Sequence, residues 1–294
     1  MSQAGIKRSF LARMIPRLTS LARQGPSGWM VIVGIVIVAA IVIMTAISSW
    51  IAPYNPIETN VGPLAAPPSS QYPMGTTDLG QDMLSRVLMG GSIMLQVSAL
   101  SVAICFLIGV PIGLFSSYVG GNFDKAVSLV VDAVYAFPGL VLAIAIASVL
   151  GPGVINMALS IAVVYIPSYF RIVRSQVLSI KELTYVEAAR SVGAKWHTVL
   201  SRYIFPNVFP SIVSVATINF ADAILTAAGL TFIGLGVSVD IADWGYDLTN
   251  GRKLVPSGIW WVITFPAIMV ILLALGFTLV GEGLSEMLNP KLER

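Results

Sequence analysis

Charged residues are scarce in this chain of 294 residues. Only 11% of its residues are Asp, Glu, Lys or Arg, 56% are apolar, and the mean hydropathy is +0.86. Because a globular domain carries about 25% charged residues, too few are present to cover a soluble surface of this size. The shortage excludes a soluble enzyme, a disordered chain and a nucleic-acid-binding protein.

Cysteine and histidine are almost absent as well. Cys105 and His197 are the single residues of their types, which excludes a disulfide framework and a zinc cluster. The chain also has no GxxxxGK[ST], HExxH or GxSxG sequence. We therefore expect no catalytic residues, no metal site and no cofactor bound by this chain.

Long apolar runs dominate what is present. A helix that crosses a bilayer needs about 20 mostly apolar residues. Six stretches meet this requirement, and two of them carry one acid each, Asp132 and Asp222. The sequence therefore predicts an all-α membrane protein with six transmembrane helices, at residues 29–51, 93–118, 126–150, 154–170, 210–236 and 259–280.

Basic residues are divided unequally among the segments that connect these runs. Residues 1–28 hold five, 119–125 one, 171–207 six and 283–294 two, so these alternate segments contain 14 of the 17. Because positively charged loops stay in the cytoplasm, we expect a multi-pass protein with both termini cytoplasmic. We interpret residues 29–51, which are too long for a cleaved signal peptide, as a membrane anchor.

Two segments are expected on the opposite side. Residues 52–91 contain six prolines, which predict an irregular arm, followed by Leu79, Met83 and Val87 at helical spacing. That spacing predicts a short amphipathic helix on the outer interface. Residues 237–258 are open to two interpretations: a lid or docking surface, or a loop anchored in the interface by tryptophans.

The cytoplasmic segment 171–207 is patterned as two helices joined by a turn. Thr184 to Glu187 fit a capping box, and Gly193 permits the backbone to end the first helix. Beyond it, an apolar stripe recurs at i, i+3, i+4 and i+7, formed by Trp196, Val199, Leu200 and Tyr203. Ala188 and Ala189 form a small knob that fits the groove of a partner. The pattern alone leaves open that Glu187 is only a cap and the stripe lies on lipid.

These residues carry a family resemblance. Glu187-Ala188-Ala189 with Gly193, followed by Tyr203-Ile204-Phe205-Pro206, resembles the EAA loop of ATP-binding-cassette (ABC) importer permeases. Nearly the whole chain after Trp29 resembles the second permease subunit of the dipeptide/oligopeptide/nickel family. The further similar stretches are Gly75 to Arg86, Ala136-Phe137-Pro138, Arg171 to Arg174, Thr231 to Gly236, Asp243-Trp244-Gly245, Gly281 to Leu284 and Asn289 to Leu292.

The resemblance implies a type I ABC importer permease fold in a prokaryotic plasma membrane. Residues 92–282 would form a five-helix core that includes the loop 171–207. The implied partners are a second homologous permease, two ABC ATPases that bind ATP and Mg, an external substrate-binding protein and lipid, with no nucleic acid. The residues implied to contact an ATPase are Glu187, Ala188, Ala189, Arg190, Gly193 and Ala194. Short peptides are the implied cargo; nickel chelates, glutathione and haem remain alternatives.

Asp222 is the strongest candidate for the translocation path. A charge at a helix centre costs about 2.5–3.5 kcal/mol on insertion, and no predicted run holds a base to pair with it. Asn219 and Thr226 lie on the same helical face, so we predict that the three line the path. Helix–helix hydrogen bonding and pairing with a partner subunit are the alternatives. Asp132, nearer the cytoplasmic edge, is expected to reach water or Lys125.

An ion-coupled secondary transporter acting alone is the competing class. Such proteins show repeated, interrupted helices and several intramembrane charges. Two acids and a structured cytoplasmic loop favour the ABC permease instead.

Overall fold

The structure is a computed structural model that describes residues 25–236 and 241–287. The predicted N-terminal basic tail before residue 25 and the motif from Asn289 to Leu292 lie outside these ranges. Within them every regular element is helical, and five helices are long and apolar enough to cross a membrane. A bent helix pair raises the number to six if it counts as one span. The predicted all-α membrane fold is therefore confirmed.

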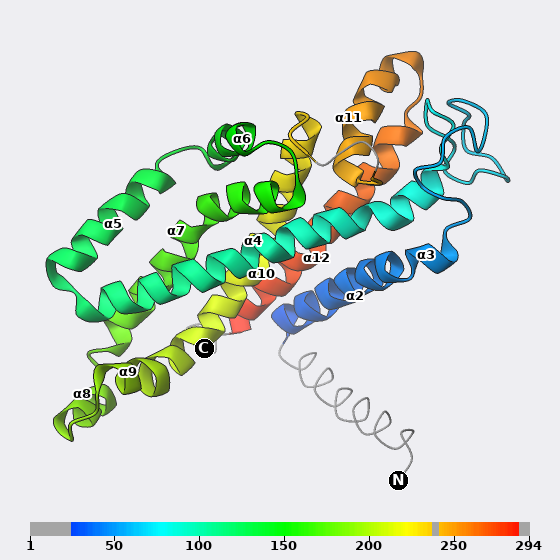
Figure 1. Ribbon diagram of the computed structural model, residues 1–294. Helices are drawn as coiled ribbons and strands as arrows, with labels where there is room; N and C mark the ends of the chain where they lie inside the picture. The colour runs from blue at the N-terminus through cyan, green and yellow to red at the C-terminus, as the bar shows by residue number, and fades with distance from the viewer. Residues whose placement is uncertain (1–24, 237–240, 288–294) are drawn as a thin grey trace, which may run out of the picture.

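The long helices form one bundle. They are α2 (Pro26–Ala46), α4 (Met83–Val119), α7 (Val154–Ile180), α10 (Phe205–Phe232) and α12 (Trp261–Met287). Figure 1 shows α2 beside α12, while α12 packs on α10, and α10 packs on α4 and α7. The shorter elements are α3 (Ser48–Ile51), α5 (Gly121–Tyr135), α6 (Gly139–Leu150), α8 (Thr184–Ser191), α9 (Trp196–Thr198), the π-helical turn η1 (Val199–Ile204), α11 (Trp244–Leu254) and the 3-10 turn η2 (Val255–Ser257).

The connecting segments gather at two opposite ends of this bundle. α8 and α9 lie at one end, which we call the α8 end (Figure 1). α11 and the irregular residues 52–82 lie at the other, which we call the α11 end. The segments predicted on opposite sides of the membrane are thus separated by the length of the bundle.

The third predicted span is not one helix. α5 and α6 meet at 88° across Ala136-Phe137-Pro138. Proline lacks a backbone N–H, and its ring disfavours helical backbone at the preceding residue. The span predicted over 126–150 is therefore divided into two helices at this proline.

The predicted interfacial helix is also wrong. Residues 78–81 are irregular, and Asp82 caps α4, because its Oδ2 accepts a hydrogen bond from the Ser85 amide at 2.8 Å. α4 then runs without interruption for 37 residues. Met83 and Val87 are buried against the start of α12, whereas Leu79 is exposed. Two of the three stripe residues, Met83 and Val87, therefore pack inside the protein and do not lie on the membrane surface.

Helix α7 continues beyond the predicted end of the fourth span. Arg171 and Arg174, expected in a loop, lie within it and pair with acids of α5. Arg171 Nη2 lies 2.7 Å from Asp132 Oδ1, and Arg174 Nη2 lies 2.7 Å from Asp124 Oδ2. The predicted loop boundary at residue 171 is wrong because these ion pairs extend the helix. Asp132 contacts Arg171 and not Lys125.

A buried polar cluster holds the α11 end together. The Arg86 side chain is fully buried; its Nε donates to Asp247 Oδ1 at 2.8 Å. Its Nη1 donates to the Pro56 carbonyl at 2.9 Å and to Gln81 Oε1 at 3.1 Å. The irregular arm, α4 and α11 are therefore joined through one guanidinium.

Trp244 completes this packing. Its ring is fully buried, and its Nε1 donates to the Val87 carbonyl at 2.9 Å. A Cβ at Gly90 or Gly91 would lie only 2.6 or 2.8 Å from the indole, so both glycines are needed for its close approach. Trp244 is thus a core residue, and its interpretation as an interfacial anchor is wrong. The second tryptophan considered for that role, Trp260, is exposed.

The acids of this cluster predict a pH-dependent stability. Burial and, to a smaller extent, the Asp247 carboxylate raise the pKa of Asp243 from 3.8 to about 7, against the opposing hydrogen bonds from the Tyr246 and Gly245 amides and the Arg86 charge. The folded protein therefore binds more protons than the unfolded chain, and stability falls as pH rises from about 4 to about 7. We expect a lower Tm at pH 8 than at pH 5.5, and a smaller difference for Asp243→Asn, measured by thermal unfolding. An equal difference in both proteins would contradict this assignment.

Candidate functional site

Helix α8 begins at a tight turn that leaves α7. The Leu183 carbonyl accepts from the amides of Val186 at 2.8 Å and Glu187 at 3.2 Å. Leu183 is therefore the N-cap, and no side chain caps this helix. The predicted capping box is wrong because Thr184 is already the first helical residue, one position too late for its hydroxyl to cap.

The helix ends at Ser191, and Gly193 follows two residues later. This residue has a φ of 82°, a left-handed conformation that glycine adopts without steric penalty. The amides of Gly193 and Ala194 donate to the carbonyls of Arg190 at 2.9 Å and Ala189 at 3.0 Å. These hydrogen bonds satisfy two backbone carbonyls of the last helical turn, and the chain then turns back into α9.

The predicted coupling residues divide into an exposed and a buried set. Val186 and Ala189 face inward, and Val186 packs in a core cluster that includes Val177 and Ile204. Ala189 is only 6% exposed, so the predicted two-alanine knob is reduced to Ala188. Ala194 is half-buried. The exposed residues, which we call the coupling patch, are Glu187, Ala188, Arg190 and Gly193.

The segment around the coupling patch is attached to the last turn of α4. Arg190 Cζ lies 5.0 Å from the centre of the Tyr118 ring, and Lys181 Nζ donates to the Ser117 carbonyl at 3.1 Å. A movement of α8 would therefore act directly on α4. The hydrophobic pattern of the sequence did not indicate these contacts.

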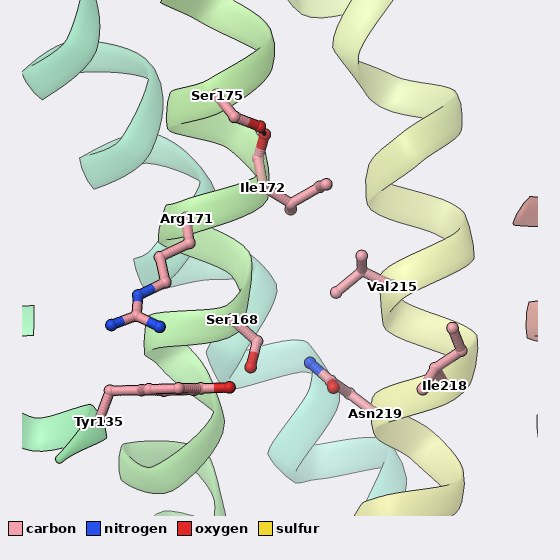
Figure 2. A pocket seen from close by; sticks show the side chains of 8 residues that line it. All are labelled: Tyr135, Ser168, Arg171, Ile172, Ser175, Val215, Ile218 and Asn219. Atoms are coloured by element: carbon pink, nitrogen blue, oxygen red, sulfur yellow. Dashed lines mark hydrogen bonds between the residues drawn. The ribbon is translucent and has the colours of Figure 1, made fainter. Parts of the chain in front are cut away.

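Two adjoining hollows lie between the α5–α6 pair, α7 and α10. The first, which we call the Asn219 hollow, has a volume of about 400 Å³. Figure 2 shows its lining residues Tyr135, Ser168, Arg171, Ile172, Ser175, Val215, Ile218 and Asn219. The second, the Asp222 hollow, measures about 250 Å³ and is lined by Val134, Tyr135, Phe137, Gly139, Leu142, Val164, Tyr165, Ser168 and Asp222. Tyr135 and Ser168 line both hollows.

Two of the three predicted path residues line these hollows. Asn219 is buried, and its Nδ2 has no hydrogen-bond partner among the described residues. Asp222 is half-buried and, within the same part of the chain, forms no ion pair. Thr226 lies elsewhere: its hydroxyl is 2.9 Å from the Tyr165 hydroxyl and donates to the Asp222 carbonyl. Thr226 thus takes the alternative role, helix–helix hydrogen bonding.

Arg171 is a hollow-lining residue that the sequence prediction placed in a loop. Its guanidinium lies 3.8 Å from the centre of the Tyr135 ring (Figure 2). Its Nη2 donates a hydrogen bond to Asp132 Oδ1. One signal in the sequence could have placed Arg171 inside a helix. Asp132 and Arg171 carry opposite charges at comparable depth in neighbouring apolar runs.

The family comparison agrees with this architecture. The profile of the family described as "Binding-protein-dependent transport system inner membrane component" matches residues 109–294. The chain belongs to this family. It is therefore a membrane subunit of a transport system, and its relatives are permease subunits.

Named relatives of this transport subunit align with most of its length. The probable D,D-dipeptide transport system permease protein DdpC of Escherichia coli K12 is 37% identical, over 87% of this chain and 86% of its own. The dipeptide transport system permease protein DppC of Alkalihalophilus pseudofirmus is 35% identical, over 89% and 86%. The glutathione transport system permease protein GsiD of Pectobacterium atrosepticum is 38% identical, over 77% and 75%.

A solved structure supports the fold of the subunit independently. A chain of the MetNI methionine ABC transporter, determined in inward-facing conformations, superposes with a TM-score of 0.55. The match covers 70% of this chain and 98% of that chain, at 18% sequence identity. The fold is thus that of an ABC transporter permease.

Proposed function

We propose that this chain is one permease of an ATP-driven importer and forms half of a translocation path for short peptides. A second homologous permease would complete the path, two ABC ATPases would supply the energy, and an external binding protein would deliver the cargo. The observation that carries the proposal is the alignment of nearly the whole chain with permeases named for dipeptide transport.

The names of the relatives also favour one cargo class. Two are named for dipeptides and one for glutathione, which is itself a tripeptide. This supports peptides over nickel chelates and haem, while glutathione stays within the proposed class.

The coupling patch is the proposed contact with an ATPase. The chain has no phosphate-binding GxxxxGK[ST] sequence, so ATP and Mg would bind to the partner. We propose that Glu187, Ala188, Arg190 and Gly193 enter a cleft of the ATPase. Closure of the ATPase pair would then move α4 through Arg190–Tyr118 and Lys181–Ser117.

The proposed orientation places the α8 end in the cytoplasm, with both termini. The support is the basic-residue bias, because residues 175–207, which contain α8 and its flanking segments, hold four of the 17 Lys and Arg residues. The α11 end would then face the external binding protein.

Reconstitution tests this proposal. We expect an ATP-hydrolysing partner to copurify with the chain, and proteoliposomes of the complex to take up radiolabelled alanylalanine only with ATP and the binding protein. Glutathione, a nickel chelate and haem serve as competitors that identify the cargo. Uptake by the isolated chain, driven by an ion gradient, would establish a secondary transporter instead.

A further inference from the structure

Two opposite charges line the paired hollows. We propose that Arg171 and Asp222 bind the two ends of a zwitterionic peptide, the free carboxylate at Arg171 and the free ammonium at Asp222. The inference rests on the proposed function and extends it, because it names the chemical groups that the path recognises.

Most N–H groups of the Arg171 guanidinium have no hydrogen-bond partner in the described part of the chain. A guanidinium carries five N–H groups, and within the described residues one hydrogen bond is formed, from Nη2 to Asp132. The Tyr135 ring supports the guanidinium plane from one side, and the side chain is 44% exposed. The group is therefore held in place while most of its N–H groups remain available to a second carboxylate.

Asp222 lacks a counter-charge in the described part of the chain. It lies in the middle of α10 and lines the second hollow, where no basic side chain pairs with it. An unpaired carboxylate at membrane depth is unfavourable, and an incoming ammonium group would supply the missing charge.

The offset of the two charged residues along the helix axes is similar to the length of a short peptide. Ser168 on α7 and Asn219 on α10 lie at one level across the Asn219 hollow (Figure 2). α7 and α10 run in opposite directions. Arg171 lies three residues after Ser168, and Asp222 lies three residues after Asn219, so the two charged residues lie on opposite sides of this level. At a rise of about 1.5 Å per residue the two levels are ~9 Å apart. An extended peptide of two or three residues spans about 7–11 Å.

Neutral polar groups lie between the charges. Figure 2 shows the Ser168 hydroxyl and the Asn219 amide pointing toward one another across the gap between α7 and α10. Asn219 is only 5% exposed; its Nδ2 and the neighbouring Tyr169 hydroxyl are both without a fully formed hydrogen bond in the described ranges. An unsatisfied buried donor is costly, and a peptide carbonyl would satisfy it. Such a site would bind the backbone and the two charged termini of a peptide, and it would accept peptides with different side chains.

Equilibrium binding of radiolabelled alanylalanine tests the inference. The sample is the complex of both permeases and both ATPases in nanodiscs, without the binding protein, so that its selectivity does not contribute. We expect Arg171→Gln and Asp222→Asn each to weaken binding about tenfold or more. Alanylalanine amide, which lacks the carboxylate, should be insensitive to Arg171→Gln, and N-acetyl-alanylalanine should be insensitive to Asp222→Asn.

Two control variants separate ligand binding from a structural role. Arg174→Gln removes the same charge from the same helix, but Arg174 is bonded to Asp124 and lines neither hollow, so binding should stay unchanged. Asp132→Asn breaks the Arg171 ion pair and leaves the guanidinium in place. Binding should then be as tight as in the unaltered complex, or tighter.

Several outcomes would overturn the inference. These are a loss in Asp132→Asn as large as in Arg171→Gln, an equal effect of Arg171→Gln on alanylalanine and its amide, or no binding by a complex that transports alanylalanine. Failure of the proposed function is distinct, because that complex would show no ATP-dependent uptake of alanylalanine even with its binding protein.

Discussion

Transport should be lost in Gly193→Trp while the assembled complex continues to hydrolyse ATP. Gly193 is exposed at the end of α8, and a Cβ placed there would meet no atom of this chain within 4 Å. The left-handed backbone costs about 1–2 kcal/mol for a residue with a side chain. The indole would therefore act on the partner surface, and we expect uptake to fall about tenfold or more, equivalent to ~1.4 kcal/mol of coupling.

Gly193→Ala is the matched control for this prediction. It imposes the same backbone strain with almost no added bulk, so transport per assembled complex should remain close to normal. Uptake and ATPase activity are measured on the same proteoliposomes, after the amount of copurified ATPase has been matched. Normal uptake by an assembled Gly193→Trp complex would show that the coupling patch does not contact the ATPase.

Hydropathy predicted the helices of this fold but not where each of them ends. The apolar runs are long enough to identify α2, α4, α7, α10 and α12 without any tertiary information. The ends depend on contacts that hydropathy does not contain. α7 continues past Arg171 because Asp132 and Asp124 neutralise its arginines, and α4 starts early because α12 buries Met83.

The same limit applies to the candidate site. A lone acid in an apolar run was enough to select Asp222, and the EAA motif was enough to select α8. Sequence spacing placed Thr226 on the face of Asp222, yet its hydroxyl is bonded to Tyr165 on a neighbouring helix. Arg171 was missed because a charge was taken as the end of a span, although an ion pair and an aromatic ring hold it at the hollow.

Removal of the Arg86 side chain should be the most destabilising single change at the α11 end. Arg86→Met would leave the Asp247 carboxylate, 1% exposed, without its ion-pair partner. Breaking a buried pair from one side costs about 3–5 kcal/mol. It would also remove the hydrogen bonds that hold Pro56 and Gln81 of the arm. We expect a clearly lower Tm, measured by thermal unfolding of the purified complex.

A double variant identifies which of these losses dominates. Arg86→Met with Asp247→Leu replaces both charges by apolar groups, a change that is often neutral in buried pairs, so most of the stability should return. Lys253→Met, on the exposed side of α11, serves as the control and should change the stability by less than about 0.5 kcal/mol. If the double variant is as unstable as Arg86→Met alone, the hydrogen bonds to the arm, and not the unpaired carboxylate, account for the effect. Arg86 would then act chiefly by fastening residues 52–82 to α4.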